Sequence, residues 1–94
     1  MYNVVLTDDA KKDLKEIMHY ISEKLSSKQA LLNFKIAFNK CINNLSYYDL
    51  GTPSHFDKEV KVVIFSNYLL FYKIYDKKDE IKVLTIVHKS QNIR

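Results

Sequence analysis

The sequence is poor in residues that interrupt regular structure or form cross-links. It has one glycine, one proline and one cysteine in 94 residues, and no tryptophan. With so little glycine and proline, long irregular loops are not expected. The single cysteine excludes a disulfide framework within the chain, and a reducing cytoplasm is the simplest expectation. Cys41 is predicted to be a small buried side chain on a helix, with a nucleophilic role as the alternative.

Long apolar runs and common site motifs are also missing. No run approaches the ~20 apolar residues that cross a membrane, so no membrane association is predicted. The first residues lack a basic segment followed by an apolar one, so no signal peptide is expected. There is no glycine-rich phosphate loop, HExxH or GxSxG motif, and neither a cofactor nor a metal site is predicted. His19 and His55 are expected to face solvent.

Three segments between residues 60 and 88 have the composition of β-strands. They are rich in β-branched and aromatic residues and cover Val60–Phe65, Tyr68–Tyr75 and Ile81–His88. Ser66-Asn67 and a charged turn at 76–80 separate them. Within the last segment, Ile81, Val83, Thr85 and Val87 alternate with Lys82, Leu84, Ile86 and His88. This is the pattern of a β-meander, which needs a cover on at least one face.

A two-residue turn at Ser66-Asn67 would pair Phe65 with Tyr68 and define two faces of the meander. The more aliphatic face is the better candidate for the core. Lys73 falls on that face and is expected to lie at a sheet edge and extend its amine to solvent. A different turn length would reverse the faces of one strand. The aliphatic face carries Val60, Val62, Ile64, Leu69 and Phe71, and the other carries Lys61, Val63, Phe65, Tyr68, Leu70, Tyr72 and Ile74.

The first half of the chain supplies the cover. Tyr2–Leu6 is predicted to be a short strand, and Thr7 to cap a helix over residues 8–24. Ser26 with Gln29 resembles a capping box for a second helix over 27–46. Both helices carry an apolar stripe at helical spacing. The residues predicted to be buried are Leu14, Ile17, Ile21, Phe34, Phe38 and Leu45.

The predicted architecture is therefore α+β, in the order β-α-α-β-β-β. A helical hairpin packs on a mainly antiparallel four-stranded sheet, in one domain over residues 1–94. The net charge is +4, and most of the excess falls in residues 51–94. This fits a surface that meets nucleic acid or an acidic partner, and equally a lysine-rich solvated face.

The order of elements and several phrases resemble the RelE/ParE superfamily of toxins from bacterial type II toxin–antitoxin systems, also described as plasmid stabilisation proteins. The resemblance covers nearly all of the chain and is closer to the ParE side, whose helices are the longer ones. The phrases that carry it are Tyr2…Leu6-Thr7-x-x-Ala10-x-x-Asp13-Leu14-x-x-Ile17-x-x-Tyr20-Ile21, Asn67-Tyr68-Leu69-Leu70-Phe71-Tyr72 and Ile81-x-Val83-x-x-Ile86-Val87-His88.

The resemblance implies one of two toxic activities. ParE-like members inhibit DNA gyrase, whereas RelE-like members cut mRNA on the ribosome. RelE-like ribonucleases have arginines where this chain has Leu69 and Ser90, and a tyrosine further on, where this sequence stops at Arg94. These differences favour gyrase inhibition. A ribonuclease would draw its catalytic groups from Lys61, Lys82, His88 and Lys89; the alternative for His88 is that it simply ends a strand.

The residues expected to contact the target, gyrase or ribosome, are Lys61, Tyr68, Tyr72, His88, Lys89 and Arg94. The resemblance also implies a cognate antitoxin, a small, acidic and partly disordered protein, joined with the toxin in a hetero-oligomer. A degenerate member that binds antitoxin without toxic activity is the third alternative.

Overall fold

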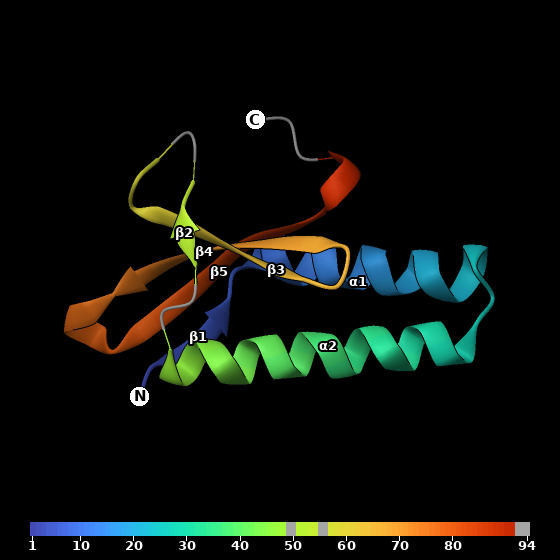
Figure 1. Ribbon diagram of the computed structural model, residues 1–94, viewed down its shortest axis with the longest axis horizontal. Coiled ribbons are helices and arrows are strands. Elements are labelled where there is room, and N and C mark those ends of the chain that lie inside the picture. Colours follow the sequence, from blue (N-terminus) through green and yellow to red (C-terminus); the bar gives the residue numbers. More distant parts are fainter. Residues whose placement is uncertain (49–50, 55–56, 92–94) are drawn as a thin grey trace.

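Two antiparallel helices lie against one face of a β-sheet (Figure 1). This computed structural model describes residues 1–48, 51–54 and 57–91, with Gln91 described by its backbone alone. The helices are α1 (Asp8–Lys24) and α2 (Lys28–Tyr47). The strands are β1 (Asn3–Leu6), β2 (Thr52–Pro53), β3 (Val60–Phe65), β4 (Tyr68–Tyr75) and β5 (Glu80–His88), with 3-10 turns η1 (Asp76–Lys78) and η2 (Lys89–Gln91).

The sheet has the strand order β1-β5-β4-β3-β2. β1 runs parallel to β5, and the other neighbours are antiparallel. The predicted α+β class, the two helices and the four predicted strands are confirmed, but the described residues form one strand more than predicted. The fifth strand, β2, pairs Thr52 with Val62 and Pro53 with Lys61. Two residues that include a proline at a sheet edge leave little strand signal in a sequence.

Side chains cap both helices as their sequences require. The Thr7 hydroxyl accepts the backbone N–H of Ala10 at 3.2 Å, as predicted for α1. For α2 the predicted cap was one residue too early: Ser27, and not Ser26, accepts the N–H of Ala30, at 3.0 Å. Ser26 instead takes a left-handed conformation, with φ 48°, and reverses the chain between the helices.

The core lies between the helices and the sheet. Ile21, Phe34 and Leu45 are buried, and the other three residues predicted to be buried, Leu14, Ile17 and Phe38, pack against the core while partly exposed. Rings from both layers meet there, with Phe34 5.2 Å from Tyr68 and Phe38 5.8 Å from Phe65 between centroids. Such edge-on and tilted pairs stabilise the contact beyond its buried area.

The sheet turns the opposite face to the helices from the one predicted. Phe65 pairs with Tyr68 as expected, but Phe65, Leu70 and Tyr72 form the helix-packed face, with Val63 against them. This face carries Phe65 and Tyr68, whose rings pack against Phe34 of α2.

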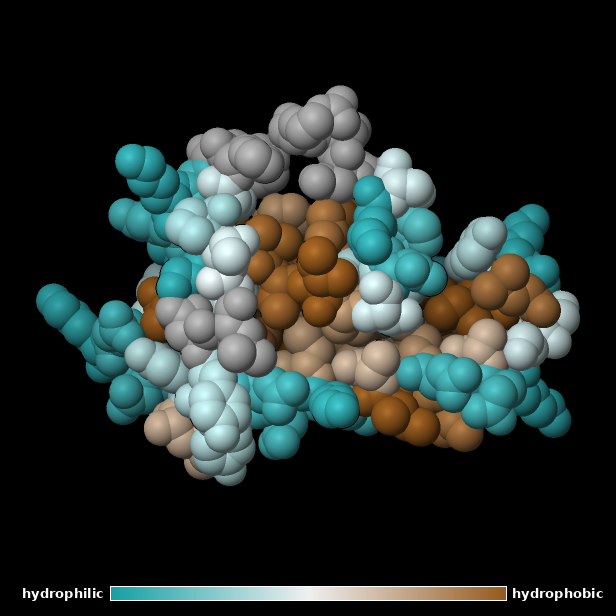
Figure 2. Space-filling model, in the orientation of Figure 1, coloured by the Kyte–Doolittle hydropathy of each residue, from teal (hydrophilic) through white to brown (hydrophobic). Residues whose placement is uncertain are grey.

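The more aliphatic face of the sheet is the outer one. Figure 2 shows apolar side chains gathered over the sheet in the middle of the view, with polar residues around them. Ile64 is 61% exposed on this face. Leu69 and Phe71 are buried because they lie on the central strand, next to Ile64 and Val62 of β3. The uniformly aliphatic composition therefore marks the outer surface and not the helix interface.

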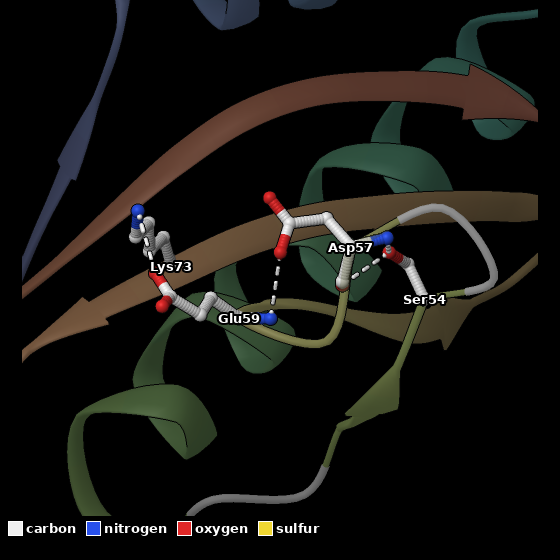
Figure 3. Close-up of polar contacts among 4 residues, drawn as sticks. All are labelled: Ser54, Asp57, Glu59 and Lys73. Carbon is white, nitrogen blue, oxygen red and sulfur yellow. Dashed lines mark hydrogen bonds and ion pairs between the residues drawn. The ribbon is translucent and has the colours of Figure 1, made fainter.

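The loop from β2 to β3 is closed by its own polar groups (Figure 3). The Ser54 hydroxyl donates to the carbonyl of Asp57 at 2.7 Å, and the Asp57 carboxylate accepts the N–H of Glu59 at 2.9 Å. Glu59 then forms an ion pair with Lys73 at 3.1 Å, and this hydrogen bond raises the pKa of Lys73. Lys73 was expected at a sheet edge, but it lies on the central strand β4 and extends to Glu59.

Cys41 is buried on α2, as predicted, and burial raises the pKa of its thiol to about 11. The thiol is therefore protonated at neutral pH and a poor nucleophile.

Gly51 donates its N–H to the Tyr72 hydroxyl at 2.9 Å. A Cβ at this position would lie 2.4 Å from that oxygen. The only glycine thus sits where no side chain fits beside a fully buried tyrosine.

We expect Phe34→Ala to lower the free energy of unfolding by ~3–5 kcal/mol, because it empties the centre of the aromatic cluster. Urea denaturation followed by circular dichroism measures the loss. Lys35→Ala, at the next and exposed position of α2, should change stability by less than ~0.5 kcal/mol. Equal losses in the two variants would show that the helix does not pack as described.

We expect Gly51→Ala to destabilise the protein by ~1–3 kcal/mol, because the new methyl group overlaps the Tyr72 hydroxyl. Thermal unfolding compares it with Thr52→Ala, at the neighbouring exposed position. A Gly51→Ala protein as stable as the parent would mean that this segment does not lie against Tyr72.

Candidate functional site

A cleft of about 450 Å³ opens between α1 and the end of β5. Tyr68, the first residue of β4, pairs with His88, the last residue of β5. Their rings meet edge to face, with centroids 5.3 Å apart. Two of the six predicted target-contact residues are therefore side by side. The cleft is lined by Asp13, Glu16, Ile17, Tyr20, Tyr68, Ile86, Val87, His88 and Ser90.

Hydrogen bonds fix the proton position on a neutral His88 ring. Its Nδ1 accepts the backbone N–H of Ser90 at 3.1 Å and lies 2.8 Å from the Ser90 hydroxyl. A backbone N–H can only donate, so Nδ1 is the unprotonated nitrogen and Nε2 carries the hydrogen. In this tautomer His88 offers a donor at Nε2. Its one basic nitrogen, Nδ1, already accepts the Ser90 N–H.

Tyr68 is a neutral ring at physiological pH. Burial, and secondly the nearby Tyr20 phenol, raises the pKa of Tyr68 above its ordinary value of 10.0. Its hydroxyl can therefore donate a hydrogen bond to a partner but does not act as a general base at neutral pH.

The α1 wall of the cleft was not predicted from the sequence. Asp13, Glu16, Ile17 and Tyr20 recur at helical spacing along one edge of α1. Asp13 also holds the helix to the sheet, because its Oδ2 accepts the Thr85 hydroxyl at 2.5 Å and the Ile86 N–H at 3.1 Å. The only signal in the sequence was the presence of Asp13, Ile17 and Tyr20 in the opening phrase.

The remaining predicted residues lie elsewhere. Lys89 follows His88 and is exposed, and its N–H donates to the Asn67 carbonyl at 2.8 Å, which fixes η2 to the β3–β4 turn. Lys61 is half-buried toward the far end of β3, opposite Tyr72. Tyr72 is fully buried and holds Gly51, so its side chain offers no surface to a partner. Arg94 and His55 lie outside the described residues, and His19 is exposed as expected.

Lys82 is also remote from the cleft. It pairs with Lys73, on the outer side of the sheet, and its amine stands 5.2 Å from the centroid of the Tyr75 ring. Lys82 and His88 are six residues apart on β5, or about 20 Å along a strand. The four candidate catalytic residues therefore do not converge on one point.

The described residues show neither a metal centre nor a membrane span. No group of three or more histidine, cysteine or acidic side chains among them could hold a metal ion. No helix in that part of the chain is long and apolar enough to cross a membrane.

Residues 4–93 match the family described as the ParE toxin of type II toxin-antitoxin system, parDE. This chain belongs to the ParE toxin family. The match spans nearly the whole chain and confirms the resemblance to the ParE side of the RelE/ParE superfamily. No curated protein matches the chain by sequence.

Solved structures share the fold at low identity. The chromosomal ParDE toxin–antitoxin system of P. aeruginosa has a TM-score of 0.75 at 20% identity, covering 94% of this chain and 96% of that one. The toxin–antitoxin complex RelBE2 of Mycobacterium tuberculosis has a TM-score of 0.64 at 20% identity, covering 96% and 93%. The isolated RelE toxin of E. coli scores 0.62 at 14% identity, covering 98% and 88%. At these identities the similarity concerns the fold.

We expect Asp13→Ala to destabilise the protein by ~1–3 kcal/mol, because it leaves the Ile86 N–H and the Thr85 hydroxyl without their acceptor. Chemical denaturation measures the loss. Glu23→Ala removes a carboxylate from the exposed side of the same helix and should have little effect. A loss no larger for Asp13→Ala than for Glu23→Ala would show that the tether does not hold α1 to β5.

Proposed function

We propose that this ParE-family chain stops bacterial growth by binding DNA gyrase, and that a co-encoded antitoxin keeps it silent. The carrying observation is the separation of the candidate catalytic groups. Cleavage of a phosphodiester requires a base, an acid and a cation around one phosphate. Here Lys82 lies on the outer side of the sheet, about 20 Å along β5 from His88.

Two further positions support inhibition by binding. Leu69, where RelE-like ribonucleases have an arginine, is buried on the outer face. Ser90, where they have a second arginine, is a hydroxyl that bonds to His88. The nitrogen that His88 would use as a base thus has two local partners, which suits a recognition surface better than a proton-transfer site.

The target surface that we propose is the end of the sheet around Tyr68, His88 and Lys89. It offers a neutral phenol, an imidazole N–H donor and an exposed ammonium group within one region. Lys61 adds positive charge toward the other end of β3, and Arg94 completes the proposed set. Tyr72 contributes from within the core, by fixing Gly51.

The proposed antitoxin is a small acidic protein, partly disordered when free, that folds onto the toxin in a cytoplasmic hetero-oligomer. The ParDE and RelBE2 relatives are toxin–antitoxin systems by their descriptions, and the positive net charge of +4 favours an acidic partner. Leu32 and Ile36, one turn apart on α2, are 51% and 57% exposed and offer apolar contacts. Co-encoding with such an antitoxin would serve plasmid stabilisation.

Expression without antitoxin should halt growth with gyrase-linked DNA breaks and filamentous cells, while mRNA stays intact. Purified protein should inhibit gyrase supercoiling, and Lys89→Ala should weaken this inhibition because it removes an exposed cation from the proposed surface. Lys77→Ala, an exposed lysine of η1, is the matched control and should have no effect.

Mapping of mRNA 5′ ends after induction separates the ribonuclease alternative. Codon-phased cuts that disappear in His88→Ala, with supercoiling unaffected, would falsify the gyrase proposal. A general acid or base supplies ~10²–10⁴-fold in rate, so its loss would be unmistakable. Antitoxin capture without toxicity in either assay would identify a degenerate member.

A further inference from the structure

The cleft beside α1 has the opposite charge to the molecule as a whole. The chain carries a net charge of +4, with fifteen lysines and arginines. Among the described residues that line the cleft there are two carboxylates, Asp13 and Glu16, and no lysine. A concave wall concentrates the field of its charges. The described residues that line the cleft therefore carry negative charge, on a protein whose net charge is positive.

Both carboxylates keep acceptor capacity. A carboxylate can accept about four hydrogen bonds over two oxygens. The two that Asp13 accepts both reach Oδ2, and its Oδ1 accepts none from the described part of the chain. Glu16 is exposed and forms no ion pair within residues 1–48, 51–54 and 57–91. A cation entering the cleft would thus find acceptors that the fold has not used.

Two of the other lining residues are tyrosines, beside aliphatic side chains and His88. Tyr20 and Tyr68 both line the cleft, and Tyr68 carries no charge at neutral pH. The face of a neutral phenol attracts a cation, and a planar guanidinium can also stack on it. Arginine suits such a site better than lysine, because it is less strongly hydrated and its fork of donors matches a carboxylate.

We propose that this cleft binds an arginine side chain presented by the protein that the toxin targets. Glu16 and Asp13 Oδ1 accept the guanidinium hydrogens, and the Tyr20 and Tyr68 rings flank its plane. An acidic antitoxin would be attracted by the lysines and not by this negative cleft, so the target is the source of the arginine. This assignment of the source rests on the proposed function, whereas the arginine site itself rests on the geometry alone.

The site can be tested on the free full-length chain by methyl NMR titration. The probe is N-acetyl-arginine methylamide, and the uncharged citrulline analogue is its isosteric control. Arginine should shift the methyl signals of Ile17, Ile86 and Val87, and citrulline should not. Glu16→Gln should weaken binding about three- to tenfold, the range for a partly exposed charged hydrogen bond. Glu23→Gln, on the same helix but outside the cleft, should leave it unchanged.

Several results would overturn the proposal. Equal shifts with citrulline, shifts confined to other surfaces, or equal losses in Glu16→Gln and Glu23→Gln would each do so. Binding that rises several-fold in Arg94→Gln would identify the chain's own arginine as the occupant, which also contradicts a partner arginine.

A second measurement tests the source of the arginine. Glu16→Gln should weaken gyrase inhibition by about the same factor as it weakens probe binding, while antitoxin binding and the unfolding temperature stay unchanged. Equal inhibition by the parent and Glu16→Gln would refute a target arginine in the cleft. If the parent itself does not inhibit gyrase, the proposed function fails, and the titration alone decides the site.

Discussion

The attachment of α1 to a β-bulge in β5 is the interaction on which the rest of the structure depends. Opposite Phe71 and Tyr72 of β4 the register shifts, because Leu84 is an extra residue in β5. α1 binds this irregular stretch at two points. The Thr7 hydroxyl donates to carbonyl oxygens at residues 83–84 while it caps the helix, and Asp13, about 1.7 turns later, accepts from residues 85–86. The helix thus satisfies polar groups that a regular ladder would have paired.

The same bulge decides which side chains face the helices. In a regular strand Ile81 and Val83 would share a face with Thr85 and Val87. With one extra residue, Ile86 joins Ile81 in the core, and His88 pairs with Tyr68 on the helix side. A single inserted position therefore places the imidazole in the cleft and not on the outer face.

Local patterns predicted the helices well and the sheet faces poorly. The spacing of apolar residues and the Thr7 cap defined α1 at both ends, because helix formation depends on near neighbours. Which face of the sheet packs on the helices depended on the aromatic side chains of α2. Phe34 packs against Phe65 and Tyr68, which lie more than thirty residues later in the sequence. The faces of β5 depended on a bulge, which composition does not reveal. Tyr68 and His88 were predicted as site residues, but the α1 wall was not, since Asp13 meets Thr85 only in the folded chain.

The pairing of β1 has a consequence for synthesis. Within the described residues, β1 joins the sheet along β5 alone, where residues 3–6 lie beside residues 80–83. A contact between segments so distant in sequence forms late and slowly, because a long loop must first be closed. A chain still growing on the ribosome that has not yet reached β5 lacks the strand with which β1 pairs. It also lacks the wall of the cleft that carries His88. Every prematurely terminated product that ends before β5 therefore lacks the β5 wall of the cleft, so a truncated chain cannot present this site.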